Sequence, residues 1–291
     1  MRTIREEANS FLADHCFGGN AVLPTVCATQ WMVSVCEDLC PGYRFFAYDN
    51  YRLYKGVVFD GKQTEQLALD VEQIAFSDAD LTLQVKVWST NQKGFRVNHY
   101  IADVVLVKQV VAAPQLSGLD NDLLINGEPS LETTAPYENG TLFHGPSFQS
   151  IQQVLDVDEK SLMLRCNAPT VEKANQGQFG VSSTNPFVDD VLYQAMLVWV
   201  KINSNKGSLP SSAKRYEQYE LIPQGAEFYV SLNVVSDQPS AMSADITLHS
   251  ESGKIYGQML GAEVTISDAL NPLFLQNSVV KSSQDRSVSA E

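Results

Sequence analysis

A histidine in a glycine-rich turn, His15, is the first residue of the sequence whose surroundings suggest chemistry. Gly18 and Gly19 follow it, and Pro24 precedes a long apolar segment that is predicted to be helical. Glycines let a ligand approach backbone amides closely, and a helix N-terminus adds a partial positive charge. A base beside such amides is what removal of a proton next to a thioester carbonyl requires. Taken alone, His15 could also be an ordinary loop histidine.

A second reactive group lies in an apolar stretch of the second half. Within residues 187–200 the only acid or amide side chains are Asp189, Asp190 and Gln194. Asp190 and Gln194 are four residues apart and share one helix face, whereas Asp189 points about 100° away and is expected to be a solvent-facing or first-turn acid. Burial would raise the pKa of Asp190 and make it a proton donor, with Gln194 holding the carboxyl group. On its own Asp190 could be a helix N-terminal charge; with His15 it makes an acid–base pair.

Two apolar helices and two series of strands are predicted around these residues. Residues 25–40 and 186–200 are apolar around most of the helix, which is typical of helices enclosed by other structure. Asn185 and Pro186 suit the cap and first position of the second helix. Period-two alternation predicts strands at 51–59, 65–75, 81–88, 95–107, 148–166 (with a turn at 156–160), 225–235, 241–249 and 253–266. Each half thus holds one buried helix and a meander of strands, which predicts an α+β fold.

The same pattern gives the domain boundaries. Residues 1–112 form the first half and residues 137–272 the second. Between them, residues 113–136 are rich in Pro, Gly, Ser and acidic residues, which predicts a linker. Residues 273–291 are predicted to be a disordered tail because most of them are polar.

Composition narrows the function classes. The net charge of −14 argues against nucleic acid and anionic membranes as partners, because both require basic surface. The N-terminus has no apolar leader and no apolar run reaches the ~20 residues of a membrane span, which predicts a soluble, cytoplasmic protein. The five cysteines lack Cys-x2-Cys spacing and the four histidines are scattered. Free buried thiols and no metal site are therefore expected.

Three segments resemble, in order, the signature motifs of polyketide synthase dehydratase domains. His15, Gly19 and Pro24 have the spacing of the family's HxxxGxxxxP motif. Residues 140–148 (GTLFHGPSF) are similar to GYxYGPxF, and residues 185–194 (NPFVDDVLYQ) are similar to HPxLLDxxxQ.

The sequence departs from the family pattern at two motif positions. His144 stands where the family usually has Tyr, and Asn185 stands where it often has His. Residues 22–28 (VLPTVCA) and 53–60 (LYKGVVFD) look most like the dehydratase-like region of bacterial polyunsaturated fatty acid synthases.

The resemblance implies a double hot-dog fold, in which two sheets each wrap around a central helix and the site lies between the halves. It implies a substrate carried on the phosphopantetheine arm of an acyl carrier protein: a 3-hydroxyacyl chain that becomes a trans-2-enoyl thioester with loss of water. His15 would take the C2 proton and Asp190 would protonate the leaving hydroxyl, with Gln194 in support and the Gly19 amide on the thioester carbonyl. No metal or nucleotide cofactor is implied. The motif residues implied to contact substrate are Pro24, His144, Gly145, Pro146 and Phe148.

Two other functions fit the same motifs. One is a non-catalytic acyl-binding or scaffolding domain of a synthase, and the other is a product-template cyclase acting on a long polyketone. Expected partners are the acyl carrier protein and other synthase domains, and a homodimer is one option for the oligomeric state. A carrier protein is usually acidic, so docking would need local basic residues, and the candidates are Lys201, Lys206, Lys214 and Arg215.

Overall fold

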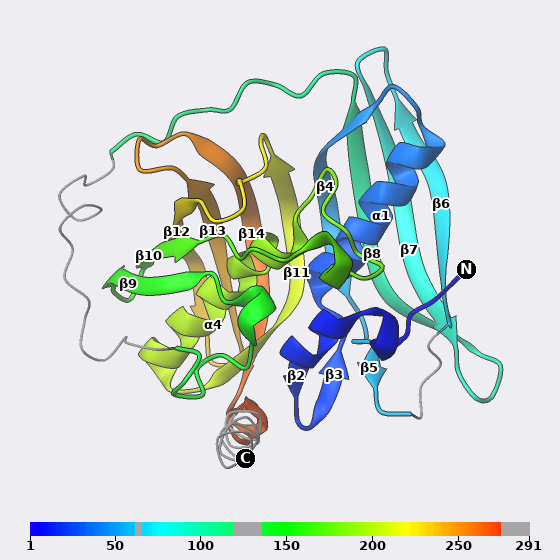
Figure 1. The fold of residues 1–291 in the computed structure, drawn as a ribbon. Coiled ribbons are helices and arrows are strands. Elements are labelled where there is room, and N and C mark those ends of the chain that lie inside the picture. Colours follow the sequence, from blue (N-terminus) through cyan, green and yellow to red (C-terminus); the bar gives the residue numbers. More distant parts are fainter. Residues whose placement is uncertain (62–65, 119–135, 275–291) are drawn as a thin grey trace.

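The computed structural model describes residues 1–61, 66–118 and 136–274. In this part of the chain, strands from both halves form one 11-stranded antiparallel sheet in the order β1-β6-β7-β8-β4-β11-β14-β13-β12-β10-β9. Two long helices, α1 (Thr25–Leu39) and α4 (Val191–Ser204), pack against it, one in each half (Figure 1). The sheet thus curves around two central helices, which confirms the predicted α+β double hot-dog fold, except that the two predicted sheets are joined into one through β4 and β11.

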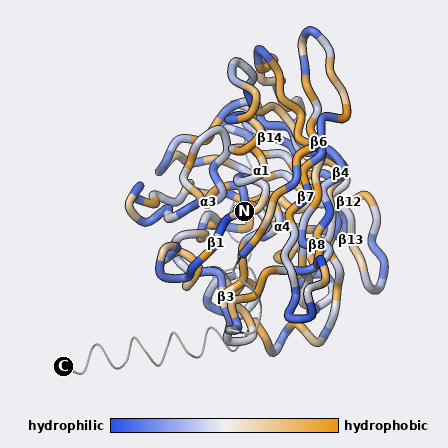
Figure 2. The backbone as a smooth tube through the Cα atoms, turned by 90° about the vertical axis from the view of Figure 1, so that its right-hand side faces the viewer, coloured by the Kyte–Doolittle hydropathy of each residue, from blue (hydrophilic) through white to orange (hydrophobic). Residues whose placement is uncertain are grey.

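The strands divide between the halves and alternate in burial. The first half contributes β1 (Arg2–Thr3), β4 (Arg44–Leu53), β6 (Gln66–Phe76), β7 (Asp80–Thr90) and β8 (Arg96–Val107). The second contributes β9 (Ile151–Val157), β10 (Ser161–Asn167), β11 (Gly207–Gln218), β12 (Glu227–Gln238), β13 (Ala241–His249) and β14 (Ile255–Ser267). Every second residue along most of β7 and β13 is buried, and Figure 2 shows hydrophobic and hydrophilic residues alternating along such strands. This alternation places one face of the sheet against the helices.

Short elements complete the described fold. A separate three-stranded sheet contains β2 (Cys16–Phe17), β3 (Asn20–Val22) and β5 (Val58–Phe59). The 3-10 turns are η1 (Glu6–Ala8), η2 (Ser10–Asp14), η3 (Pro146–Phe148), η4 (Lys173–Asn175) and η5 (Asp268–Leu270). A single helical turn, α3 (Pro186–Asp189), leads into α4. As predicted, Asn185 caps it, since its side chain accepts a hydrogen bond from the Phe187 amide, and Pro186 occupies the first position.

Both central helices are enclosed, as their apolar composition predicts. Every residue of α4 from Val191 to Val200 is buried, and so is every residue of α1 from Thr25 to Val33. Fully burying one large apolar side chain contributes about 1.5–3 kcal/mol, so these two helices hold much of the core together.

The two halves are joined by pairing between β4 and β11. Arg215 lies opposite Asp49 in this pairing, and its guanidinium group donates to both Asp49 carboxylate oxygens, at 2.8 and 2.9 Å. Strand β11 was not predicted, because its sequence GSLPSSAKRYEQ has no apolar alternation, and β4 begins at residue 44 and not at the predicted residue 51. The expected strand 51–59 is therefore wrong, since the chain leaves the large sheet after Leu53 and β5 pairs with β3 in the separate three-stranded sheet.

The predicted linker and tail lie only partly within the described residues. Of the expected linker, residues 119–135 lie outside the described residues, while Gln115 forms a β-bridge with Lys254. The tail was expected to begin at residue 273, but Phe274 is buried and its ring lies 4.9 Å from that of Phe143. The remainder of the expected tail, residues 275–291, lies outside the described residues.

None of the helices that the structure describes is both long and apolar enough to cross a membrane. All five cysteines are free, as predicted; Cys27, Cys36 and Cys166 are buried, whereas Cys16 and Cys40 are half-buried.

Candidate active site

His15 is held by two hydrogen bonds to a single residue of the neighbouring strand. It lies at the end of η2, where the β2–β3 hairpin begins. The Val22 amide donates to the His15 carbonyl oxygen at 3.0 Å, and the His15 Nδ1 atom donates to the Val22 carbonyl oxygen at 2.8 Å. Because a carbonyl oxygen only accepts, Nδ1 carries the proton and Nε2 keeps a free lone pair.

The surroundings of His15 keep its ring neutral. The pKa of His15 is lowered to about 4, chiefly by burial and also by the nearby His144, against the opposing effects of Asp190 and the Val22 carbonyl. His15 is only 8% exposed, with Phe143 and Phe148 against its ring. At neutral pH the side chain is therefore an unprotonated base.

Asp190 lies between α3 and α4, and its carboxylate is buried. The Gln194 Nε2 group donates to Asp190 Oδ2 at 2.8 Å, which confirms that these two residues share a helix face. Gln194 is fixed in turn, because the same amide donates to the Phe148 carbonyl oxygen and its own oxygen accepts from the Tyr137 hydroxyl at 2.7 Å. The carboxylate is thus held by a chain of hydrogen bonds that reaches back to the start of the second half.

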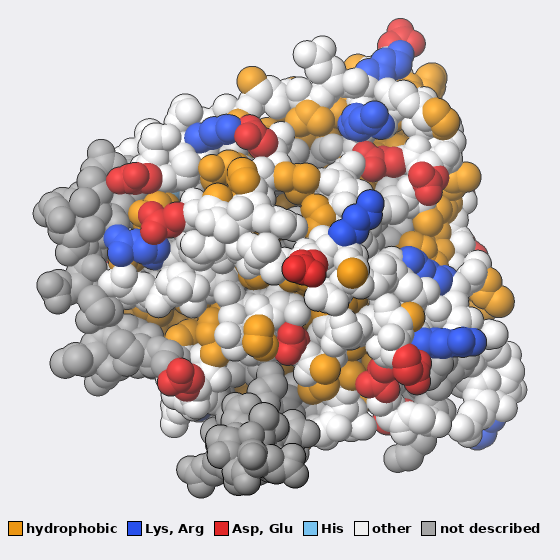
Figure 3. Space-filling model, viewed as in Figure 1, with side chains coloured by type: hydrophobic (Ala, Val, Ile, Leu, Met, Phe, Trp, Pro, Cys, Tyr) orange, Lys and Arg blue, Asp and Glu red, His pale blue; other side chains and the backbone are white. Residues whose placement is uncertain are grey.

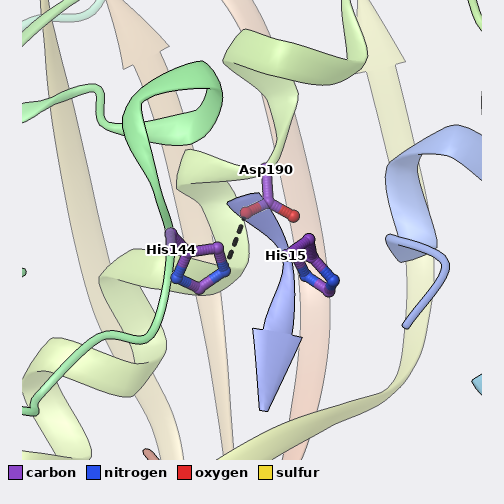
Figure 4. Close-up of side chains that lie close together, drawn as sticks. All are labelled: His15, His144 and Asp190. Atoms are coloured by element: carbon purple, nitrogen blue, oxygen red, sulfur yellow. Dashed lines mark ion pairs between the residues drawn. The ribbon is translucent and has the colours of Figure 1, made fainter. Parts of the chain in front are cut away.

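His144 is the third member of this cluster. Its Nε2 atom lies 3.1 Å from Asp190 Oδ2, the same oxygen that Gln194 contacts. Figure 4 shows that the other carboxylate oxygen points to the side of His15. His15, His144 and Asp190 come from three separate segments, so only the folded chain brings them together.

The ionisation of Asp190 differs from the sequence-based expectation. Desolvation by burial raises its pKa, as expected, but the charge and hydrogen bond of His144, with smaller contributions from His15 and Gln194, outweigh that effect. The net pKa of Asp190 is below its ordinary value. The prediction of a raised pKa was wrong because it took account of burial and Gln194 but not of the charge and hydrogen bond that His144, with His15, brings to the carboxylate.

The neighbouring Asp189 behaves in the opposite way. It belongs to the first turn, as predicted, but it is half-buried instead of solvent-facing, and Asp189 Oδ2 accepts from the Asn185 amide at 3.2 Å. Burial raises the pKa of Asp189 to about 7. It lies outside the cavity that holds Asp190.

An apolar cavity of about 280 Å³ holds the cluster. His15, His144, Asp190 and Gln194 all line it. The other motif residues of the expected site, Gly19, Pro24, Gly145, Pro146 and Phe148, are not among the lining residues.

The motif residues outside the cavity shape the segments that carry the reactive groups. Gly18 and Gly19 both have positive φ angles, 60° and 80°, and form the two-residue turn between β2 and β3 that glycine favours. Pro24 is the N-cap residue of α1. These residues set the backbone on either side of Val22, which holds His15.

The 145–148 turn is fastened directly to the segment before His15. The Gly145 amide donates to the Asp14 carbonyl oxygen at 2.7 Å, and both the amide and the hydroxyl of Ser147 donate to Asp14 Oδ2. Phe148 packs its buried ring near His15 and binds Gln194 through its carbonyl oxygen. The turn therefore places His144 beside His15. Asp14 and Ser147 were missed from the sequence, where nothing marks a contact across more than a hundred residues.

The same cluster has residue types that also bind metals. One ligand atom from each of His15, His144 and Asp190 lies within 4.8 Å of the others. However, the Asp190 carboxylate already occupies His144 Nε2, and His144 Nδ1 has no hydrogen-bond partner in the described part of the chain. Histidines that bind metals almost always have their second nitrogen hydrogen-bonded. The donor set fits proton transfer better than metal binding.

Comparison with known proteins connects this geometry to a family. Residues 132–273 match the family model described as the polyketide synthase dehydratase N-terminal domain, a match that falls on the second half of this chain. A polyunsaturated fatty acid synthase subunit from Thraustochytrium sp. (strain ATCC 26185 / S-3) is 32% identical over 274 residues. That alignment covers 92% of this chain but only 9% of the synthase polypeptide, so the chain spans a small part of its relative.

Solved dehydratase domains share the fold. The dehydratase domain of the CurH module of curacin polyketide synthase is 18% identical, with a TM-score of 0.66 over 94% of this chain and 92% of that one. The dehydratase domain of RzxB from Pseudomonas fluorescens is 14% identical, with a TM-score of 0.65 over 88% and 90%. A trans-AT polyketide synthase dehydratase domain from Brevibacillus brevis is 19% identical, with a TM-score of 0.66 over 88% and 90%.

Proposed function

Because this chain is a dehydratase domain of the polyketide synthase type, we propose that it removes water from a 3-hydroxyacyl thioester to give a trans-2-enoyl thioester. The observation that carries the proposal is the buried, neutral His15, whose free Nε2 lies in the same apolar cavity as the Asp190 carboxylate. A positioned base and a second group for the leaving hydroxyl are the two elements that such an elimination needs.

His15 is the base in this proposal. Its Nε2 lone pair takes the C2 proton, which is acidified by the adjacent thioester carbonyl. The developing negative charge on the carbonyl oxygen then requires hydrogen-bond donors. The first turn of α1 offers them, since helices leave their first N–H groups without intrahelical partners, and Thr25 of that turn lines the cavity. This turn replaces Gly19 as the proposed contact for the thioester.

Asp190 holds the 3-hydroxyl group and delivers the proton that leaves with it. The lowered pKa means that the carboxylate starts ionised, so a proton must reach it during the reaction. The proton that His15 takes from C2 balances the reaction: C2 loses one proton, the C3–O bond breaks, and the hydroxyl gains one proton to become water. His15 and Asp190 have polar atoms within 4.8 Å of each other in one cavity, so a bound hydroxyl group or water molecule relays the proton between them.

Neither rival function gains support from the geometry. A scaffolding domain has no need for a base and a carboxylate that are both desolvated and both fixed by hydrogen bonds. A cyclase of long polyketones needs room for a folded chain, whereas the cavity of about 280 Å³ is near the lower end of the ligand-pocket range.

We propose that the acyl chain arrives on the phosphopantetheine arm of an acyl carrier protein, within a synthase that contributes further domains. The reaction as written needs no metal or nucleotide. The free cysteines fit the reducing conditions of the cytoplasm.

The experiment that tests this function is incubation with a carrier-bound 3-hydroxyacyl substrate, followed by mass spectrometry. Loss of water with formation of a 2-enoyl thioester supports the dehydratase. An unchanged substrate that nevertheless binds would point to the scaffolding alternative, and cyclised products from a polyketone would point to the cyclase.

A further inference from the structure

The cavity opens to solvent at one side, which the exposure of its lining residues identifies. His15, His144, Asp190 and Gln194 are all buried. The half-buried lining residues are Phe17, Leu53, Gly56, Val58, Leu209 and Pro210. Lys55, between β4 and β5, is the exposed member of the lining. A substrate therefore enters past Lys55.

Lys55 is also the one cation that lines this cavity within the described ranges. It makes no ion pair with another described residue. Two of the basic residues expected from the sequence to bind a carrier differ in this respect. Lys206 lies 4.0 Å from Asp268, and Arg215 is bound to Asp49 and Glu217.

The backbone that carries Lys55 is fixed relative to the base. The Lys55 carbonyl oxygen accepts from His99 Nδ1 at 2.8 Å, and His99 is buried and bound to Ser89. Two residues later, the Val57 carbonyl oxygen accepts from the Leu23 amide at 2.9 Å. Leu23 directly follows Val22, whose carbonyl oxygen accepts the hydrogen bond from His15 Nδ1. The backbone at the cavity entrance, which carries Lys55, and the backbone that holds His15 are thus joined by hydrogen bonds.

The wider surface gives an anionic ligand little other attraction. The chain carries a net charge of −14, and on the face in Figure 3 the Lys and Arg side chains lie singly among Asp and Glu. The Lys55 ammonium group, which has no ion pair within the described part of the chain, is then the local attraction at the entrance for an anion whose other end reaches into the cavity.

We propose that Lys55 binds the phosphate group of the phosphopantetheine arm and so selects carrier-type thioesters at the mouth of the cavity. The inference rests on the proposed function, because it assumes that a thioester is presented to His15. The arm carries an anionic phosphodiester, and an ammonium group is a compact partner for such an anion. The acidic carrier protein then needs no large basic patch on this domain.

Two substrates that differ only in the phosphate test this proposal. They are the same 3-hydroxyacyl chain on phosphopantetheine and on pantetheine. The wild-type protein is expected to have a kcat/KM roughly fivefold higher for the phosphorylated thioester, the size of effect that an exposed ion pair gives. Lys55→Gln is expected to remove this preference through KM, and Lys55→Arg to restore most of it. The preference is expected to shrink as salt is added.

Lys93→Gln is the matched control, because Lys93 is an exposed lysine of the same half that does not line the cavity. It is expected to keep the wild-type preference. Equal loss on both thioesters in Lys55→Gln would overturn the phosphate assignment, and so would a wild-type protein without preference. If the wild-type protein dehydrates neither thioester, the proposed function itself fails; dehydration of both without preference rejects only the role of Lys55.

Discussion

The Nδ1 atom of His15 donates a hydrogen bond to the carbonyl oxygen of Val22 across 2.8 Å, and both residues are buried. This contact fixes the tautomer, because a carbonyl oxygen cannot donate. The free Nε2 lone pair then lies on the cavity side with Asp190. Burial adds the second condition for a base, since it disfavours the charged imidazolium form.

The pH dependence of kcat/KM follows from these ionisations. Only neutral His15 can accept a proton, and its pKa is lowered to about 4, so kcat/KM is expected to rise with pH through about 4 and then level off. The raised pKa expected for Asp190 from the sequence would add a falling limb, from loss of the Asp190 proton. The lowered pKa of Asp190 removes that limb from the neutral range. Initial rates measured across buffers, with circular dichroism to confirm folding, provide the check; a midpoint near the ordinary 6.5 would contradict the assignment.

Asp190→Asn and Asp189→Asn form a matched pair of adjacent substitutions. Asp190→Asn preserves the shape of the side chain but cannot carry a proton, so dehydration is expected to slow by ~10²–10⁴-fold. Asp189→Asn changes a carboxyl group that does not line the cavity, and it is expected to leave the rate near that of the wild type. Steady-state dehydration rates of the two variants, compared with the wild-type rate, measure this difference. Near wild-type dehydration by Asp190→Asn would reject this residue's role.

Asp189→Asn is expected to change the stability of the protein in a pH-dependent way. The pKa of Asp189 is raised to about 7, above its ordinary 3.8, so its contribution to stability is full below about 4 and is lost as pH rises through 7. Asp189→Asn is therefore expected to raise Tm relative to the wild type at pH 8 and to raise it less at pH 5. Thermal unfolding at the two pH values measures this, and an equal effect at both would show that Asp189 does not titrate in this range.

Tyr137 supports Gln194 from outside the cavity, which makes Tyr137→Phe a test of the hydrogen-bond chain. Its hydroxyl donates to Gln194 and accepts from the Ile151 amide at 3.0 Å, so its loss leaves two buried groups without a partner. A loss of about 1–3 kcal/mol in unfolding free energy is expected. Tyr193→Phe is the control, because the buried Tyr193 hydroxyl has no hydrogen-bond partner among the described residues. Similar unfolding free energies for the two variants in urea would contradict this account.

Arg215 is expected to be a structural residue of the seam between the halves. Arg215→Ala removes the paired hydrogen bonds to Asp49 and the contact with Glu217, and it is expected to lower the unfolding free energy by about 1 kcal/mol. The ratio of kcat/KM values for phosphopantetheine and pantetheine thioesters is expected to stay at the wild-type value. A selective rise in KM for the phosphorylated thioester would restore the sequence-based view that Arg215 contacts the carrier.

The helices and reactive residues were predictable from the sequence because each carries a local signal. Enclosed helices are apolar all round, and Asp190 and Gln194 stand out as polar residues at helical spacing. His15 is marked by the glycines and the proline that follow it. These patterns, with the order of the three motifs, were sufficient to predict the fold and to single out His15 and Asp190, which the structure brings into one cavity.

The contacts between distant segments were not predictable in this way. Strand β11 has a polar, Pro-containing sequence, and its pairing with β4 is set by the tertiary fold. The lowered pKa of Asp190 depends on His144, which lies 46 residues earlier in the sequence. Lys55 lies in the 53–60 segment quoted for the family resemblance, but that segment does not mark it as a site residue, and only the exposure of the cavity lining draws attention to it.

The most direct measurement is the rate at which the wild-type protein and His15→Ala dehydrate one 3-hydroxyacyl thioester, followed by the absorbance of the enoyl product. The wild-type protein is expected to form the product, and His15→Ala to be slower by ~10²–10⁴-fold, because water does not replace a positioned base. Thermal unfolding of the variant is measured alongside, so that a lost base can be told from a lost fold. Full dehydration by folded His15→Ala would contradict the central claim.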